Sequence, residues 1–160
     1  MSVVMFLARA LLAPALVVGG SPSVPCTALF HPPVAGAVID PYRPPACRWC
    51  PGNRGIDYAT VPGDPVRAAA KGVVAFAGPV AGRLVIVVNH PDGLRTTYDG
   101  VAGLATSVGT VVGADDVIGV AADRLHFGVR QGDTYLDPGL YLAVSCPRAR
   151  LVPLGGWRPY

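Results

Sequence analysis

Two short segments of the chain hold residue types that could bind a metal ion. Asn53 and Asp57 flank Gly55, and His126 lies much further along, two positions after Arg124. Catalytic zinc takes three protein ligands, usually histidine nitrogens and carboxylate oxygens, and keeps a fourth position for water. The chain has only three histidines. The pattern therefore predicts a zinc-type site with parts missing, in which Asp57 and His126 are the candidate ligands and Asn53 is a weaker one.

The spacing of Asn53 and Asp57 makes a local demand on the backbone. On a flat strand, residues four apart are separated by roughly 13 Å, which is too far for one ion. Gly55 permits a bend that brings both side chains to one point. By itself the pattern is also that of a turn with two hydrogen-bonding side chains.

The strand that carries His126 is the clearest element in the sequence. Between residues 124 and 130, Leu125, Phe127 and Val129 alternate with polar residues and glycine, which is typical of a strand with one buried face. His126 and Arg124 therefore share the face that points away from the core.

Other short strands are predicted at 66–70, 73–77, 84–88, 94–98, 108–113 and 116–119, separated by turn residues. With 20 Gly and 17 Pro, the chain is expected to be an all-β antiparallel sheet or sandwich with little or no helix outside the first 25 residues. His90 falls at the corner of a hairpin, and His31 precedes two prolines. Structural roles are expected for both.

The 160 residues suit a single domain. The net charge of +3 comes almost wholly from arginine, since Lys71 is the only lysine, and the basic residues form no continuous run, so nucleic acid is not expected as a partner. Residues 1–25 have the layout of a secretory signal, with an uncleaved N-terminal anchor as the alternative. A Pro-rich lead-in arm over 26–50, the β domain over 51–142 and a tail over 143–160 would follow.

Four cysteines, Cys26, Cys47, Cys50 and Cys146, predict two disulfides with three possible pairings in an oxidising compartment. The Cys47-Arg48-Trp49-Cys50 segment could instead be half of a zinc knuckle or a redox pair.

Several segments together resemble the lysostaphin/LytM-type zinc metallopeptidases in order and spacing. The resemblance covers about residues 31–142 and is carried by these segments: 51–59, 65–69 with 72–74, 89–93 with Thr97-Tyr98, 117–119, 125–127 with Val129-Arg130, and Asp137-Pro138. It implies a β-rich fold with a groove and a secreted or cell-wall-associated bacterial protein. It also implies zinc as cofactor and peptide cross-links of peptidoglycan as substrate.

Position by position, the resemblance implies that Asp57 and His126 match two zinc ligands of the family, while Asn53 stands where the family has its first histidine ligand. Arg124 replaces the first histidine of H-x-H, and Gly100 falls where a further catalytic histidine follows Tyr98 by two residues. No catalytic residue is therefore predicted with the family's chemistry, and bound zinc would be weak. Arg124 and Tyr98 are the expected substrate-binding residues.

Three functional hypotheses follow. The first is a catalytically degraded domain that binds peptidoglycan stem peptides or regulates a cell-wall hydrolase. In this hypothesis Arg124 is available to bind a carboxylate. Alternatively, Arg124 could pair with Asp57 or Asp123 and only stabilise an emptied site. The second is an active zinc endopeptidase in which Asn53 or Asp99 completes the ligand set. The third is a biotinyl- or lipoyl-type carrier domain modified at Lys71, which does not lie in the expected Met-Lys-type context.

Overall fold

The computed structural model describes residues 29–47 and 49–142 of the chain. The predicted signal segment 1–25, the tail 143–160, Cys26 and Cys146 lie outside these residues. Within the described part of the chain, none of the helical segments is long and apolar enough to cross a membrane.

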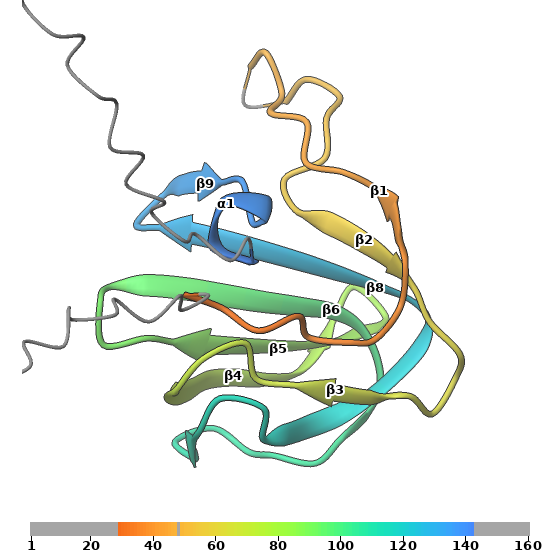
Figure 1. Ribbon diagram of the computed structural model, residues 1–160, viewed down its shortest axis with the longest axis vertical. Coiled ribbons are helices and arrows are strands. Elements are labelled where there is room, and N and C mark those ends of the chain that lie inside the picture. The colour runs from red at the N-terminus through yellow and green to blue at the C-terminus, as the bar shows by residue number, and fades with distance from the viewer. Residues whose placement is uncertain (1–28, 48, 143–160) are drawn as a thin grey trace, which may run out of the picture.

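The predicted all-β class is confirmed, because the strands form one antiparallel sheet (Figure 1). The strands are β1 (Val38–Asp40), β2 (Ile56–Ala59), β3 (Pro65–Arg67), β4 (Gly72–Val80), β5 (Arg83–Asn89), β6 (Leu94–Leu104), β7 (Val111–Val112), β8 (Val117–Gln131) and β9 (Thr134–Leu136). Their order is β1-β2-β8-β6-β5-β4-β7, and β3 and β9 also pair with β8. Among the described residues, only Gly139–Leu142 form a helix, α1.

Strand β8 connects most of the sheet. Its 15 residues join two segments that were predicted as separate strands, 116–119 and 124–130. The first part pairs with β3, the second with β2 and β9, and β6 runs beside both. The β6–β8 register shifts between Asp99 and Val101, and such an irregularity bends the pair without ending it. Residues 120–123, which lie between the two predicted strands, are therefore accommodated inside one bent strand.

The core lies on one face of β8. Leu125, Phe127 and Val129 are fully buried, as their alternation predicted, and the Phe127 ring lies 5.3 Å from that of Tyr98 between centroids. The lead-in arm contributes Phe30 and Val34 to the same cluster. Each such side chain contributes about 1.5–3 kcal/mol through burial. The packed unit thus begins well before residue 51.

Two of the three histidines have structural roles. His90 is buried at the β5–β6 hairpin, where Nδ1 lies 2.8 Å from the carbonyl oxygen of Lys71 and Nε2 lies 2.8 Å from Oγ1 of Thr96. His31 is an exposed loop residue whose Nδ1 lies 2.6 Å from a carboxylate oxygen of Asp115. Neither residue faces His126.

Cys47 and Cys50 form a disulfide, so this pair is neither a zinc knuckle nor a reduced dithiol in the structure. The loop that contains it connects β1 to β2 and projects from the body of the sheet, at the top of Figure 1.

Candidate functional site

The register of four strands places a row of polar residues across the sheet. Asp40 of β1 lies opposite Asp57 of β2, Asp57 opposite His126 of β8, and His126 opposite Asp99 of β6. Directly opposed residues of antiparallel strands point to the same face. The row therefore lies on the face opposite to the core, and it brings together the two predicted ligands, Asp57 and His126.

Asp57 is the buried centre of this row. Its side chain is 3 % exposed, and its Oδ1 lies 2.8 Å from Nδ1 of His126. Its Oδ2 accepts hydrogen bonds from Nη2 of Arg124 and, at 3.1 Å, from Nδ2 of Asn53. Both carboxylate oxygens are thus bonded to protein groups. The charge of Asp57 is compensated by the permanently protonated guanidinium of Arg124.

The orientation of the Asn53 amide is determined by the backbone around it. Its Oδ1 accepts a hydrogen bond from the backbone N–H of Gly55 at 3.2 Å, and its Nδ2 donates to the carbonyl oxygen of Asp40 at 3.2 Å. A backbone N–H can only donate and a carbonyl can only accept, so a flipped amide would lose both bonds. Asn53 therefore presents donor hydrogens, and not its oxygen, to Asp57.

Asp57 and Arg124 shift each other's pKa. Burial by itself raises the pKa of Asp57, because a carboxylate loses hydration there, but hydrogen bonds and positive charge from Arg124 and His126 outweigh burial and lower that pKa below its usual value. The hydrogen bond to Asp57 and the charge of that carboxylate raise the pKa of Arg124. Both shifts keep the Asp57–Arg124 pair ionised at neutral pH.

The side chains around Asp57 do not fit a catalytic zinc ion. Such a site needs three converging protein donors, and no three His, Cys, Asp or Glu side chains of the described residues form such a group. Asn53 turns its amide nitrogen toward Asp57. Arg124 is bonded to Oδ2 of Asp57, and His126 to Oδ1. Asp99, the alternative ligand, is paired with Arg83 through Oδ2, which lies 3.0 Å from Nη2, while its buried Oδ1 has no hydrogen-bond partner among the described residues.

Gly100 stands where the resemblance places a catalytic histidine, and its backbone excludes a side chain. Its φ is +95°, and a Cβ atom there would lie 2.2 Å from the carbonyl oxygen of Arg124. The close approach of β8 at Arg124 therefore depends on the missing side chain at Gly100. The two departures from the family pattern are linked through one backbone contact.

One sequence-based interpretation is corrected by the structure. Tyr98 was expected to contact substrate, but it is fully buried in the core, where its hydroxyl accepts a hydrogen bond from the backbone N–H of Ala69 at 2.8 Å. Burial raises the pKa of Tyr98 to about 12. The bend predicted around Gly55 is present, and it brings Nδ2 of Asn53 to 3.1 Å from Oδ2 of Asp57. Proximity adds a second reason for glycine, because a Cβ atom there would lie 2.3 Å from the carbonyl oxygen of Phe127.

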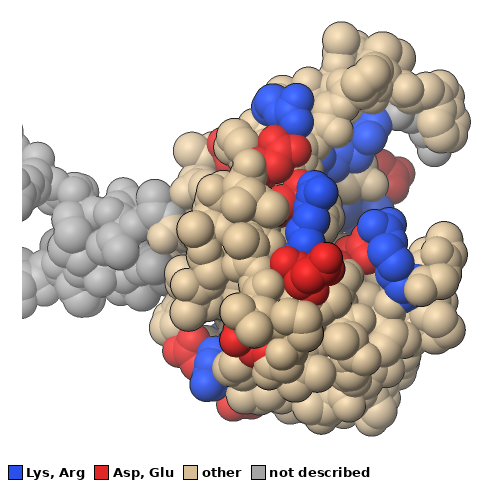
Figure 2. Space-filling view, turned by 90° about the vertical axis from the view of Figure 1, so that its right-hand side faces the viewer, with Lys and Arg blue, Asp and Glu red and all other residues tan. Residues whose placement is uncertain are grey.

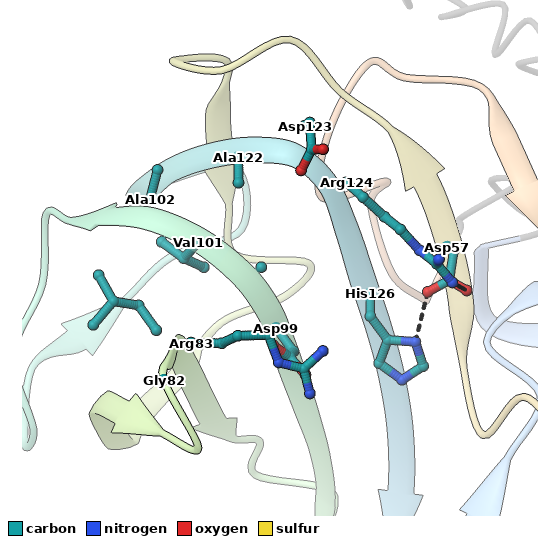
Figure 3. A pocket seen from close by; sticks show the side chains of 12 residues that line it. Asp57, Gly82, Arg83, Asp99, Val101, Ala102, Ala122, Asp123, Arg124 and His126 are labelled. Atoms are coloured by element: carbon teal, nitrogen blue, oxygen red, sulfur yellow. Dashed lines mark hydrogen bonds and ion pairs between the residues drawn. The ribbon is translucent and has the colours of Figure 1, made fainter.

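Asp57, His126 and Asp99 of this row line a groove of about 740 Å³. Figure 3 shows Arg124 reaching from β8 toward Asp57, with Arg83 beside Asp99 on the other wall. The molecular surface in Figure 2 carries interleaved basic and acidic side chains on a hollowed face. A second hollow of about 880 Å³ shares Asp99 and His126 with this groove and has an apolar floor that includes Phe76 and Val87.

Each aspartate of the row has its own arginine, which the sequence did not reveal. Arg43 contacts Asp40 at 2.9 Å, Arg124 contacts Asp57, and Arg83 contacts Asp99. A separation of three residues was the only local signal, for Asp40 and Arg43. The other two pairs depend on strand register, which a single sequence does not specify.

The chain has similarity to curated bacterial proteins. The uncharacterized protein Rv2891 of Mycobacterium tuberculosis (strain ATCC 25618 / H37Rv) is 42 % identical over 131 residues, which cover 74 % of this chain and 51 % of that protein. The DD-carboxypeptidase/endopeptidase Mpg of Neisseria gonorrhoeae (strain ATCC 700825 / FA 1090) is 31 % identical over 107 residues, covering 62 % of this chain and 24 % of Mpg. The chain thus spans about half the length of the mycobacterial relative and 24 % of the length of Mpg.

Solved structures share the fold. Csd3 of Helicobacter pylori superposes with a TM-score of 0.65 at 27 % identity, over 73 % of this chain and 34 % of Csd3. The catalytic domain of the antimicrobial peptidase lysostaphin from Staphylococcus simulans gives a TM-score of 0.54 at 26 % identity, over 67 % of this chain and 90 % of that domain. The sequence profile of Peptidase family M23 matches residues 51–138, more than half of the chain, and with β2, β6 and β8 inside that match the chain belongs to Peptidase family M23.

Proposed function

We propose that this domain binds carboxylate-bearing stem peptides of peptidoglycan in the groove beside Arg124 and does not hydrolyse them efficiently. The observation that carries the proposal is the ion pair between Arg124 and Asp57. It puts a permanent cation on the carboxylate that a zinc ion would need, and it leaves that cation at the groove surface.

Arg124 is suited to hold a carboxylate. Its side chain is 56 % exposed although it contacts the buried Asp57. A guanidinium has five N–H donors in a planar fork, so donors remain for a ligand after Asp57 is bonded. Asp57 holds the guanidinium in place, which lowers the entropic cost of binding. The similarity to Mpg, a DD-carboxypeptidase/endopeptidase, supports a peptide as the ligand class.

Hydrolysis would lack two contributions. The arrangement of Asn53 and Arg124 disfavours the metal, and Arg124 and Gly100 leave no histidine base at either family position. General acid–base catalysis is often worth about 10²–10⁴ in rate. A domain of this kind would act by binding wall peptides, or by presenting the groove to a cell-wall hydrolase. We place it outside the bacterial cytoplasm, secreted or associated with the wall, on the strength of the predicted signal in residues 1–25.

The test combines metal content with ligand binding. Purified wild type and Asn53→His are equilibrated with zinc and desalted, and their zinc content is measured; wild type is expected to retain far less than one equivalent. Calorimetric titration with a soluble stem tetrapeptide is expected to show binding that Arg124→Gln weakens about tenfold or more. Arg67→Gln is the matched control, because Arg67 donates to a backbone carbonyl away from the groove.

The second candidate is an active zinc endopeptidase, favoured by the convergence of Asp57 and His126 at 2.8 Å. Tightly held zinc near one equivalent, together with chelator-sensitive cleavage of purified cell wall, would establish this candidate. The same result would refute the proposal of a non-hydrolytic binding domain.

A further inference from the structure

A cystine-closed turn presents a tryptophan at the far end of the groove face. The Cys47–Cys50 disulfide spans three positions, and the backbone N–H of Cys50 donates to the carbonyl oxygen of Cys47 at 3.1 Å. Trp49 lies inside this small ring and is 86 % exposed. A single exposed apolar side chain is common on protein surfaces, so a binding role for Trp49 depends on the groups that surround it.

The disulfide has its main effect on the loop. In the chain-entropy account, the stabilisation by a crosslink grows with the length of the loop it closes, and this loop is among the shortest possible. The Cys47–Cys50 crosslink therefore contributes little to global stability compared with one that spans the sheet. Its consequence is local, because it restricts the conformations from which Trp49 can be presented. Such preorganisation raises the affinity of a binding surface.

Trp49 lines a hollow of about 830 Å³ together with Tyr135, Arg130 and Asp133. Tyr135 is on β9, and the guanidinium carbon of Arg54 lies 5.7 Å from its ring centroid. The hollow thus combines two aromatic side chains with two arginines and one carboxylate, and Arg54 already faces one side of the Tyr135 ring. It shares Arg54, Arg130 and Tyr135 with the apolar hollow that joins the Asp57 groove, so the binding surfaces are continuous.

Arg130 is the polar group in this hollow whose bonding is incomplete. It follows His126 by four residues on β8, on the same face, and its Nε is buried without a hydrogen-bond partner among the described residues. Its guanidinium also makes no ion pair within that part of the chain. Nε has almost no accessible surface, so a ligand in the hollow would be met by the terminal N–H groups of the Arg130 guanidinium.

We infer that this hollow is a saccharide-binding site, with Trp49 and Tyr135 as stacking surfaces and Arg130 and Asp133 as hydrogen-bonding groups. A sugar ring exposes a face of C–H groups that packs against aromatic rings, and its hydroxyls both donate and accept hydrogen bonds. Arg130 supplies donors and Asp133 supplies an acceptor, which matches hydroxyl groups better than a purely anionic ligand. The inference is independent of peptide binding at Arg124, although a glycan that carries peptides would fit the continuous surface.

The experiment uses the fluorescence of Trp49. The chain has two tryptophans, so Trp157→Phe leaves Trp49 as the only reporter. Titration of this variant with peptide-free tetra-N-acetylchitotetraose is expected to give a saturable change in emission below about 10 mM. Calorimetry with Trp49→Ala and Arg130→Gln is expected to show affinity reduced about tenfold or more, and Arg67→Gln should bind like wild type. Cys47→Ser/Cys50→Ser should weaken binding while thermal unfolding stays close to that of wild type.

Arg124→Gln separates this inference from the proposed function. It should weaken binding of the stem tetrapeptide and leave the saccharide titration unchanged, whereas Trp49→Ala should do the reverse. The inference is overturned if the sugar gives no saturable signal, if Trp49 responds only to the peptide, or if correctly folded Trp49→Ala binds the sugar with wild-type affinity.

Discussion

At the scale of single residues, the charge of Asp57 is balanced by Arg124 where the family has a metal. Asp57 is almost completely buried, and a carboxylate in that position needs a cation and hydrogen-bond donors to remain ionised. Arg124, Asn53 and His126 supply them. Asp57 and these three partners therefore form a self-contained electrostatic unit.

Replacing Arg124 by Gln is expected to lower the free energy of unfolding by about 1–3 kcal/mol at pH 7, because Asp57 loses its cation while buried. The exposure of Arg124 keeps the effect below that of a fully buried pair. The pKa of Asp57 is lowered in the folded protein. The stabilisation is thus fully present above the unfolded pKa of about 3.9 and is lost as the pH falls through the folded value. The free energies of unfolding of wild type and variant, measured by urea denaturation, should converge as the pH falls below the lowered pKa of Asp57.

Arg67→Gln serves as the matched control for this prediction. Arg67 donates through Nη1 to the backbone carbonyl oxygen of Asp115 at 2.8 Å, and that acceptor does not titrate. Arg67→Gln should therefore lower the free energy of unfolding only slightly, and by the same amount at every pH. A pH-independent cost for Arg124→Gln would show that packing, and not the ion pair with Asp57, explains the loss.

At the scale of elements, the irregularity between β6 and β8 determines what the groove can contain. Gly100 adopts a positive φ and touches the backbone of β8 at Arg124. A histidine cannot be restored there by one substitution, because the two strands would have to move apart. The absence of a histidine at position 100 and the bend of β8 therefore have a common structural cause.

Gly100→Ala is expected to cost about 2–4 kcal/mol of unfolding free energy, from the strain of positive φ together with the collision at the carbonyl oxygen of Arg124. Gly82→Ala is the control. Gly82 also has a positive φ, of +81°, but open space surrounds the Cβ position, so only the strain of about 1–2 kcal/mol applies. Equal costs in thermal or urea unfolding would contradict the close contact at Gly100.

At the scale of the whole molecule, the described chain closes on itself. The backbone N–H of Phe30 donates to the carbonyl oxygen of Tyr141 at 3.0 Å, and the two rings stack with centroids 5.4 Å apart. The arm before residue 51 and the segment after β9 therefore complete the same core. The region with family motifs is smaller than the unit that folds.

Phe30→Ala is expected to lower the free energy of unfolding by about 3–5 kcal/mol, although Phe30 lies outside every recognisable motif. Leu29→Ala is the neighbouring control, since Leu29 is 67 % exposed and Phe30 is 2 % exposed. The control should change stability by less than about 0.5 kcal/mol. Similar small losses for both variants, measured by urea denaturation, would mean that the arm is not part of the cooperative unit.

The sequence by itself determined the fold class, the strand that carries His126 and the identity of the three departures, Asn53, Arg124 and Gly100. Those features depend on local alternation, turn residues and motif spacing, which one chain displays directly. It also placed Tyr98 wrongly, because a motif position does not reveal which face of a strand a side chain occupies relative to its neighbours.

Only the tertiary structure decided which arginine pairs with which aspartate. It also decided that two of the departures, Arg124 and Gly100, are in contact through the backbone. Strand register, a relation between distant segments, puts Arg124 on Asp57, Arg83 on Asp99 and the carbonyl oxygen of Arg124 against Gly100. The tertiary fold likewise brings Trp49 of the β1–β2 loop and Arg130 of β8 to one hollow. The chemistry of the groove follows from these long-range contacts, since each one decides whether a polar group is satisfied within the fold or is left for a ligand.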